Sequence, residues 1–183
     1  MTAITLDTQS RIVEGDASSA VRVLIFEDMQ CPDCVAFREM LDEKLLPRFG
    51  ARAAFEHRDF PLPKHTWARA AAVAARFFEA RQPELGARFR QWTMQSMDDI
   101  NAGEFEDFLR EFAAQNECDA EAALAALQDR QFAGLVERDY QDGVARGVRR
   151  TPTVLVGDVP FVERFKVEQV ATAIEAALRE AGL

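Results

Sequence analysis

The sequence of 183 residues contains few cysteines and no long apolar run, and each shortage bears on what the protein can be. A chain of this length buries roughly 70% of its unfolded surface, so its 48% apolar residues can form a core without disulfides or a structural metal. No uninterrupted apolar stretch approaches the ~20 residues of a membrane span, and we therefore expect no membrane insertion. The 3 cysteines need an explanation other than stability.

Basic residues are also scarce, because 22 Lys and Arg stand against 31 Asp and Glu, a net charge of −9. This surplus of acid, without a dense basic run, repels polyanions and excludes a nucleic-acid partner. The opening segment, MTAITLDTQSRIVEGD, lacks the basic and apolar regions of a secretory signal. We expect a cytoplasmic location for the chain as written, and a periplasmic or extracytoplasmic one if the natural protein starts with further residues.

The first third of the chain predicts a strand, a helix and a second strand. Residues 21–27 form an apolar, β-branched run, and we expect a second strand over residues 53–60, which stops at Pro61-Leu62-Pro63. Between them, apolar residues at helical spacing predict a helix that begins near Cys31, has Pro32 at its first position and ends around Pro47 and Gly50. Such a unit has a right-handed crossover in nearly all proteins, so we predict a parallel pair of strands.

The middle of the chain, from residue 64 to about 147, is rich in Ala, Glu, Gln and Arg and predicts helices alone. We expect four or five helices, over residues 65–81, 84–97, 104–116, 119–128 and 132–146. Strands then follow at 153–156 and 159–165, joined by a tight turn at Gly157-Asp158, and a helix closes the chain at 167–181. Since we find no repeats or linkers, we predict one α/β domain over residues 1–183, with a helical insertion at about 63–147.

Cys31-Pro32-Asp33-Cys34 is the sharpest chemical signal, because this CxxC motif lies between the first predicted strand and helix. Two intervening residues let both sulfurs lie within one helical turn, close enough for a reversible disulfide. The unpaired N–H groups and dipole of a helix N-terminus favour thiolate over thiol. This motif beside a strand-helix-strand unit is typical of thioredoxin-like redox proteins. We predict that Cys31 is the exposed nucleophile and that Cys34 resolves the mixed disulfide.

The cysteines allow two other interpretations, a zinc site and an inert buried pair. A zinc site usually needs four ligands, and the further candidates, Cys118, His57 and His65, lie in scattered contexts, so we expect no metal. An inert pair of buried cysteines is the second alternative. An inert pair does not explain why the two cysteines lie at a strand-to-helix turn with a proline between them. We interpret Cys118 as a passenger.

Thr151-Pro152-Thr153, just before the late strand, is a second signal. A proline there would interrupt strand pairing and indicates a special backbone geometry, for which a cis peptide bond is the candidate. The chain also carries, in order, VRVLIFED, MQCPDC, HRDFPLPKHTWARAAAVAARF, the helical stretch and GVRRTPTVLVGD. In this order the segments resemble, over nearly the whole chain, the DsbA-like thiol:disulfide oxidoreductases of the thioredoxin superfamily.

The resemblance implies a thioredoxin fold, in which a central mixed sheet is flanked by helices, with an all-helical insertion over the active-site end. It implies that Cys31 and Cys34 are the redox pair, that Pro152 is a cis-proline facing them, and that the backbone of Thr151 pairs with an extended substrate peptide. The Arg149-Arg150 pair offers a bias of that groove toward acidic peptides, but we interpret the two arginines first as solvated surface charges.

The implied function is exchange of disulfides with protein or peptide thiols through a mixed disulfide, without a dissociable cofactor. It requires a redox recycling partner that the sequence does not identify, and it leaves open whether the protein is an oxidase or a reductase. The alternative from another class is a redox-inert thioredoxin-like module that binds peptides in the groove beside Pro152.

Two positions depart from the family pattern. Many relatives have a buried glutamate six residues before the first cysteine, where this chain has Ile25, and the nearest carboxylates are Glu27 and Asp28. Asp33 stands where strongly oxidising members have histidine, and a carboxylate there opposes the thiolate. We therefore assign Pro32 and Asp33 to tuning the pair, and predict a Cys31 pKa nearer the value of about 7 in thioredoxin than the value of about 3.5 in DsbA, with a less oxidising disulfide.

Overall fold

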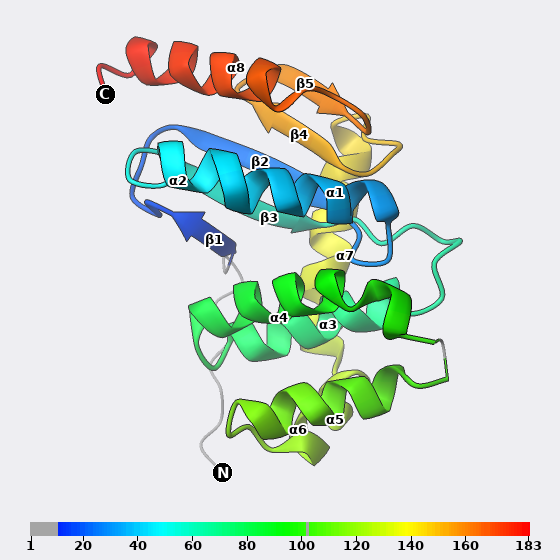
Figure 1. Ribbon diagram of the computed structural model, residues 1–183. Coiled ribbons are helices and arrows are strands. Elements are labelled where there is room, and N and C mark those ends of the chain that lie inside the picture. The colour runs from blue at the N-terminus through cyan, green and yellow to red at the C-terminus, as the bar shows by residue number, and fades with distance from the viewer. Residues whose placement is uncertain (1–10, 102) are drawn as a thin grey trace.

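The computed structural model describes residues 11–101 and 103–183. Residues 1–10, which open the segment that we interpreted as lacking a secretory signal, lie outside the described residues. At the centre is one mixed sheet of five strands in the order β1-β3-β2-β4-β5 (Figure 1). The strands are β1 Ile12–Gly15, β2 Arg22–Glu27, β3 Ala54–Asp59, β4 Thr153–Val156 and β5 Val159–Val162. A mixed sheet flanked by helices is the fold class that the sequence predicts.

The pairing of the strands follows the predicted connections. β2 and β3 are parallel, so that Glu27 at the end of β2 lies beside Asp59 at the end of β3. β4 pairs antiparallel with both β2 and β5. β5 ends at Val162, three residues earlier than predicted, because Glu163 adopts a left-handed conformation with φ of 55°. The edge strand β1, antiparallel to β3, was missed, since its four residues IVEG lie in a polar segment without a strand pattern.

Every predicted helix is present, and most are shorter by one to three residues at an end. They are α1 Pro32–Met40, α2 Leu46–Phe49, α3 Ala68–Glu79, α4 Pro83–Gln95, α5 Phe105–Gln115, α6 Ala120–Ala126, α7 Arg130–Ala145 and α8 Val167–Glu180. A π-helical segment, Leu41–Leu45, joins α1 to α2. The helix ends at Phe49 with Gly50 as its C-cap, which confirms the predicted end around Pro47 and Gly50. Pro47 itself lies in the first turn of α2, where proline is tolerated. None of the described helices is long and apolar enough to cross a bilayer.

Alternate residues of the strands form apolar cores on the two faces of the sheet. Val23 and Ile25 of β2 belong to the core that includes residues of α1 and α8. Phe26 faces the other way and packs with Phe60 beside α7, which crosses behind the sheet (Figure 1). At Gly143 of α7, a Cβ atom would come within 2.7 Å of the Phe60 ring, so only glycine permits this close approach.

Helices α3 to α6 lie beyond the β1 side of the sheet, with α5 and α6 farthest from it (Figure 1). They enclose a separate apolar core rich in aromatic rings. In it the ring centroids of Phe78, Phe89 and Phe112 are 4.8 to 5.0 Å apart. These helices thus bury their apolar faces mainly against one another, although Ile12 of β1 and Cys34 of α1 also belong to this core. A polar connection to the sheet adds to that apolar contact.

A buried cluster of charges makes that connection. Arg76 of α3 and Arg90 of α4 are both almost completely buried and both donate to the carboxylate of Asp59 at the end of β3, Arg76 Nε at 2.6 Å from Asp59 Oδ2. Arg76 also pairs with Glu79 at 3.1 Å and with the buried Asp139 of α7. Burial by itself would raise the pKa of Asp59, but the two guanidinium groups outweigh it and lower the pKa. One carboxylate therefore links the sheet to two helices.

Removing the guanidinium of Arg76 should strongly destabilise the protein. In Arg76→Met, Asp59 loses one of its two cationic partners and Asp139 loses its contact with Arg76, and loss of one partner from a buried ion pair costs about 3–5 kcal/mol. The measurement is the free energy of unfolding in urea. The matched control is Arg69→Met on the same helix, whose ion pair with Glu137 is about half exposed and should contribute about 1 kcal/mol or less. Equal losses in the two variants would contradict a structural role for the cluster.

Candidate active site

Cys31 lies where β2 gives way to helix α1, as predicted. It is the N-cap residue, with an extended backbone (φ −98°, ψ 119°), and Pro32 is the first helical residue. Cys34 lies in the first turn and is completely buried, whereas Cys31 is 6% exposed and opens into a pocket. Cys31 is thus the more accessible thiol of the two, although much less exposed than we expected.

The loop before β4 covers Cys31. Cys31 Sγ lies 3.4 Å from the carbonyl oxygen of Thr151, which accepts a hydrogen bond from the thiol. The Thr151-Pro152 peptide bond is cis, the geometry for which the sequence made it a candidate. Thr153 Oγ1 donates to the Arg150 carbonyl at 2.7 Å, and the Glu163 N–H donates to the Pro152 carbonyl at 2.8 Å. These bonds fix the loop and bring Thr151 to a cysteine 120 positions away.

The two thiols have opposite pKa shifts. A hydrogen bond from Cys34 contributes most to lowering the pKa of Cys31 to about 6, while burial opposes the shift. The side chain of Thr151 and the N–H groups of Cys34 and Asp33 at the helix start lower the pKa further. Burial, followed by contact with Cys31 and the charge of Glu27, raises the pKa of Cys34. Near neutral pH, Cys31 is therefore mainly thiolate and Cys34 is thiol.

Ile25 stands where many relatives have a buried glutamate. Of the two nearby carboxylates, Glu27 has the place more similar to that of the missing glutamate. Ile25 is in the apolar core, and Glu27, two residues along the same strand, lies on the same face and is completely buried at the end nearest Cys34. Its carboxylate is 2.7 Å from His57 Nδ1 and 3.2 Å from an Arg90 nitrogen. Although burial opposes it, contact with His57 and Arg90 lowers the pKa of Glu27, so the group stays charged. That charge adds to the effect of burial and of Cys31 in raising the pKa of Cys34.

Asp28, the second carboxylate near Ile25, contacts the loop after β3 and not His57 or Arg90. Its carboxylate accepts from the backbone N–H groups of Gln30 and Leu62, each at 2.7 Å, and contacts His65 Nδ1 at 2.7 Å. Its own N–H donates to Cys34 Sγ at 3.4 Å. Asp28 therefore joins the segment before Cys31 to the loop after β3. No local pattern indicates the contacts of His57 and His65, because their partners are remote in the sequence.

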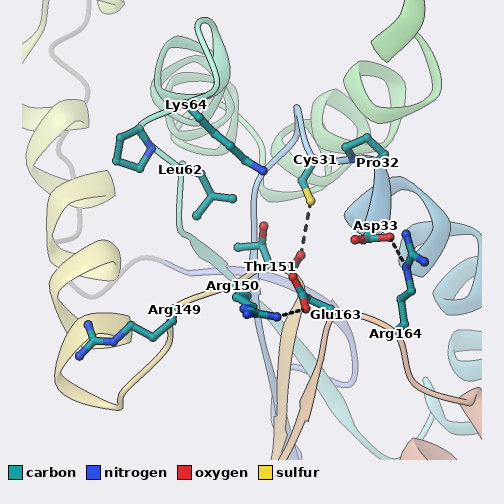
Figure 2. Close-up of a pocket in the computed structure, with 11 residues that line it drawn as sticks. Cys31, Pro32, Asp33, Leu62, Lys64, Arg149, Arg150, Thr151, Glu163 and Arg164 are labelled. Atoms are coloured by element: carbon teal, nitrogen blue, oxygen red, sulfur yellow. Dashed lines mark hydrogen bonds and ion pairs between the residues drawn. The ribbon is translucent and has the colours of Figure 1, made fainter.

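Asp33 also has a partner that the sequence analysis missed. Arg164, in the turn after β5, places its Nε 3.3 Å from Asp33 Oδ1 (Figure 2). The pair is 131 residues apart in the chain, so no local pattern indicates it. The Asp33 side chain is one-third exposed and that of Arg164 is almost fully exposed. Arg164 offsets part of the negative charge that Asp33 brings to Cys31.

A pocket of about 690 Å³ opens beside Cys31 (Figure 2). It lies where the start of α1, the loop after β3, the loop before β4 and the turn after β5 meet. Its lining residues are Cys31, Pro32, Asp33, Leu62, Pro63, Lys64, Arg149, Arg150, Thr151, Glu163 and Arg164. The pocket thus contains most of the residues that the sequence singled out, together with Lys64, Glu163 and Arg164, which it did not. Cys34 and Pro152 do not line it. Within residues 11–101 and 103–183, no three His, Cys, Asp or Glu side chains are arranged to hold a metal ion.

The chain is similar to known proteins both in sequence and in fold. A family model described as thioredoxin matches residues 7–176. Oxidised BdbD from Bacillus subtilis superimposes with a TM-score of 0.83 at 21% identity, over 94% of this chain and 95% of that one. Wolbachia pipientis α-DsbA1 gives 0.82 at 16% identity, over 97% and 96%. DsbA from Chlamydia trachomatis gives 0.77 at 14% identity, over 100% and 98%. None of the curated proteins compared with the chain matches it.

The reactivity of Cys31 should follow its low pKa. In a Cys118→Ser background, the rate of alkylation by iodoacetamide should rise through a midpoint near pH 6 and level off above it, because only the thiolate reacts. Adding Cys34→Ala should move the midpoint upward, since the hydrogen bond from Cys34 is lost. A midpoint near the ordinary value of about 8.5 in the Cys118→Ser protein would contradict the assignment.

Asp33 should oppose the thiolate even though Arg164 partly offsets it. We expect Asp33→Asn to lower the pKa of Cys31 by less than about one unit, because removing a nearby like charge favours the thiolate. Thiolate absorbance against pH measures this. The control is Asp98→Asn, which makes the same chemical change outside the pocket and should leave the midpoint where it is. A rise in the Asp33→Asn protein would show that the carboxylate acts in some other way.

Proposed function

The chain belongs to the thioredoxin family and has a DsbA-like fold, and from this we propose that it is a thiol:disulfide oxidoreductase acting on protein or peptide thiols. The observation that carries the proposal is the unequal pair of thiols at the start of α1. Cys31 opens into the pocket with a pKa of about 6, and the completely buried Cys34 has a raised pKa. A nucleophile that is charged at neutral pH and a second thiol that stays neutral until needed are what exchange requires.

In the reducing direction, the Cys31 thiolate attacks one sulfur of a substrate disulfide. A mixed disulfide forms between Cys31 and that sulfur, and the other substrate sulfur leaves as a thiolate. Cys34 then loses its proton and attacks Cys31 Sγ, so that the second substrate thiol is released. The substrate gains two electrons and the protein becomes the Cys31–Cys34 disulfide. The oxidising direction is the reverse of these steps.

Thr151 and Pro152 are the proposed substrate-binding residues. An extended substrate segment lying along the loop before β4 would pair with the backbone of Thr151 by strand addition. The Thr151 carbonyl lies 3.4 Å from Cys31 Sγ, close enough to hold the reacting sulfur of such a segment beside the nucleophile.

Turnover requires a partner that restores the starting redox state, because each cycle leaves the pair changed by two electrons. No dissociable cofactor enters these steps, since both sulfurs belong to the protein. We propose that this partner also acts by thiol exchange at Cys31.

Reduction of insulin disulfides tests the proposal. With dithiothreitol as electron donor, the protein should accelerate reduction, and Cys31→Ser should not. Prereduced Cys34→Ser, mixed with insulin after dithiothreitol is removed, should accumulate a mixed disulfide through Cys31. Cys118→Ser should behave as the unmodified protein, because Cys118 lies outside the pocket. A protein that binds peptides but accelerates nothing would instead be a redox-inert binding module.

Equilibration with glutathione buffers measures the direction in which the pair works. The Cys31 pKa of about 6 lies above the value of about 3.5 in DsbA, so the reduced form is less favoured than in DsbA. We expect a reduction potential between about −270 mV, as in thioredoxin, and about −120 mV, as in DsbA. A potential at or above the DsbA value would contradict the role given to Asp33.

A further inference from the structure

The pocket beside Cys31 is positively charged in a chain that is strongly acidic overall. Four cations line it, Lys64, Arg149, Arg150 and Arg164, against the two carboxylates of Asp33 and Glu163, so its formal charge is 4 − 2 = +2. The whole chain carries −9. The local charge around the reacting thiol is therefore opposite in sign to that of the molecule.

Both carboxylates of the pocket are already neutralised by its own arginines. Asp33 pairs with Arg164 at 3.3 Å, and Glu163 with Arg150 at 2.7 Å. Lys64 and Arg149 form no ion pair with any residue that the structure describes. The sequence pointed to Arg149 and Arg150 as a pair, whereas the structure pairs Arg150 internally and provides Lys64 as the second unpaired charge.

The two unpaired cations lie on different walls around the thiol. Lys64 comes from the loop after β3, and its side chain extends toward Cys31 (Figure 2). Arg149 extends outward from the adjoining rim, which the loop before β4 forms (Figure 2). Both side chains are exposed and available to a ligand. A peptide whose cysteine reaches Cys31 must therefore pass close to Lys64, and its flanking residues can reach Arg149.

We propose that this pocket selects thiol and disulfide peptides that carry acidic side chains next to the reacting cysteine, with Lys64 and Arg149 as the residues that recognise them. The inference rests on the proposed function and adds its substrate class. At physiological ionic strength the screening length is about 8 Å, so the remote acidic surface is largely screened while contacts inside the pocket persist. Selection then depends on the pocket and not on the net charge of the chain.

The test compares two peptides, each with one internal disulfide, that differ only in having Glu or Gln on both sides of one cysteine. Rates of reduction by the prereduced protein are measured at physiological ionic strength. Each rate is divided by the rate with dithiothreitol, which removes the intrinsic effect of the flanking charge on the disulfide. An exposed ion pair contributes about 0.2–1 kcal/mol, so two such contacts should favour the Glu peptide by about twofold to tenfold or more.

Lys64→Gln and Arg149→Gln should each lower this preference, and the double variant should bring it close to one. The matched control is Lys44→Gln, an exposed lysine of the π-helical segment outside the pocket, which makes the same change in net charge and should leave the preference intact. A loss of preference in Lys44→Gln equal to that in Lys64→Gln would overturn the inference. So would equal corrected rates for the two peptides, although the proposed function would then stand. If neither peptide is reduced, the proposed function itself fails.

Discussion

The buried carboxylate of Asp59 is the point on which the arrangement of the molecule depends. Without it, two guanidinium groups would lie inside the protein with too little negative charge, and the helices α3 and α4 would lose their polar attachment to the sheet. Asp59 is also the last residue of β3, immediately before the loop that carries Leu62 and Lys64 into the pocket. The same ionic contacts that join the helices to the sheet therefore fix one wall of the site.

The chemistry of the site follows from how unequally two neighbouring thiols are surrounded. Cys31 is surrounded by donors: the Cys34 thiol and the free N–H groups of a helix start. Cys34, one turn further on, is surrounded by apolar groups and by the charge of Glu27. Glu27 can remain ionised in the interior only because His57 and Arg90 compensate it. The electrostatic state of the Cys34 thiol is thus linked, through Glu27 and Arg90, to the cluster at Asp59.

Periodicity and turn chemistry predicted most of the fold, because these signals are local. β1 was not predicted, because a short edge strand in a polar segment has no alternating pattern of apolar and polar residues. The CxxC pair and the proline before β4 could be assigned from sequence because each has a distinctive local context. The buried Arg76 and Asp139 could not, since a charged residue in a helix looks like a surface residue until its partner 63 positions away is known. The pairing of Asp33 with Arg164 was invisible for the same reason.

The run of helices from α3 to α7 leaves the sheet just after Lys64 and returns to it just before Arg149. Both ends of that run therefore lie at the pocket. Strand β2 and helix α1, at whose start Cys31 and Cys34 lie, precede the run in the chain. A change in the length or packing of these helices would move two walls of the pocket relative to each other. It would also change the surroundings of Cys31 and Cys34, because both cysteines lie in the core that these helices enclose. Gly143, pressed against Phe60, limits how far such a change can go on the α7 side. The same stretch of sequence therefore sets both the width of the pocket and the packing around the two thiols.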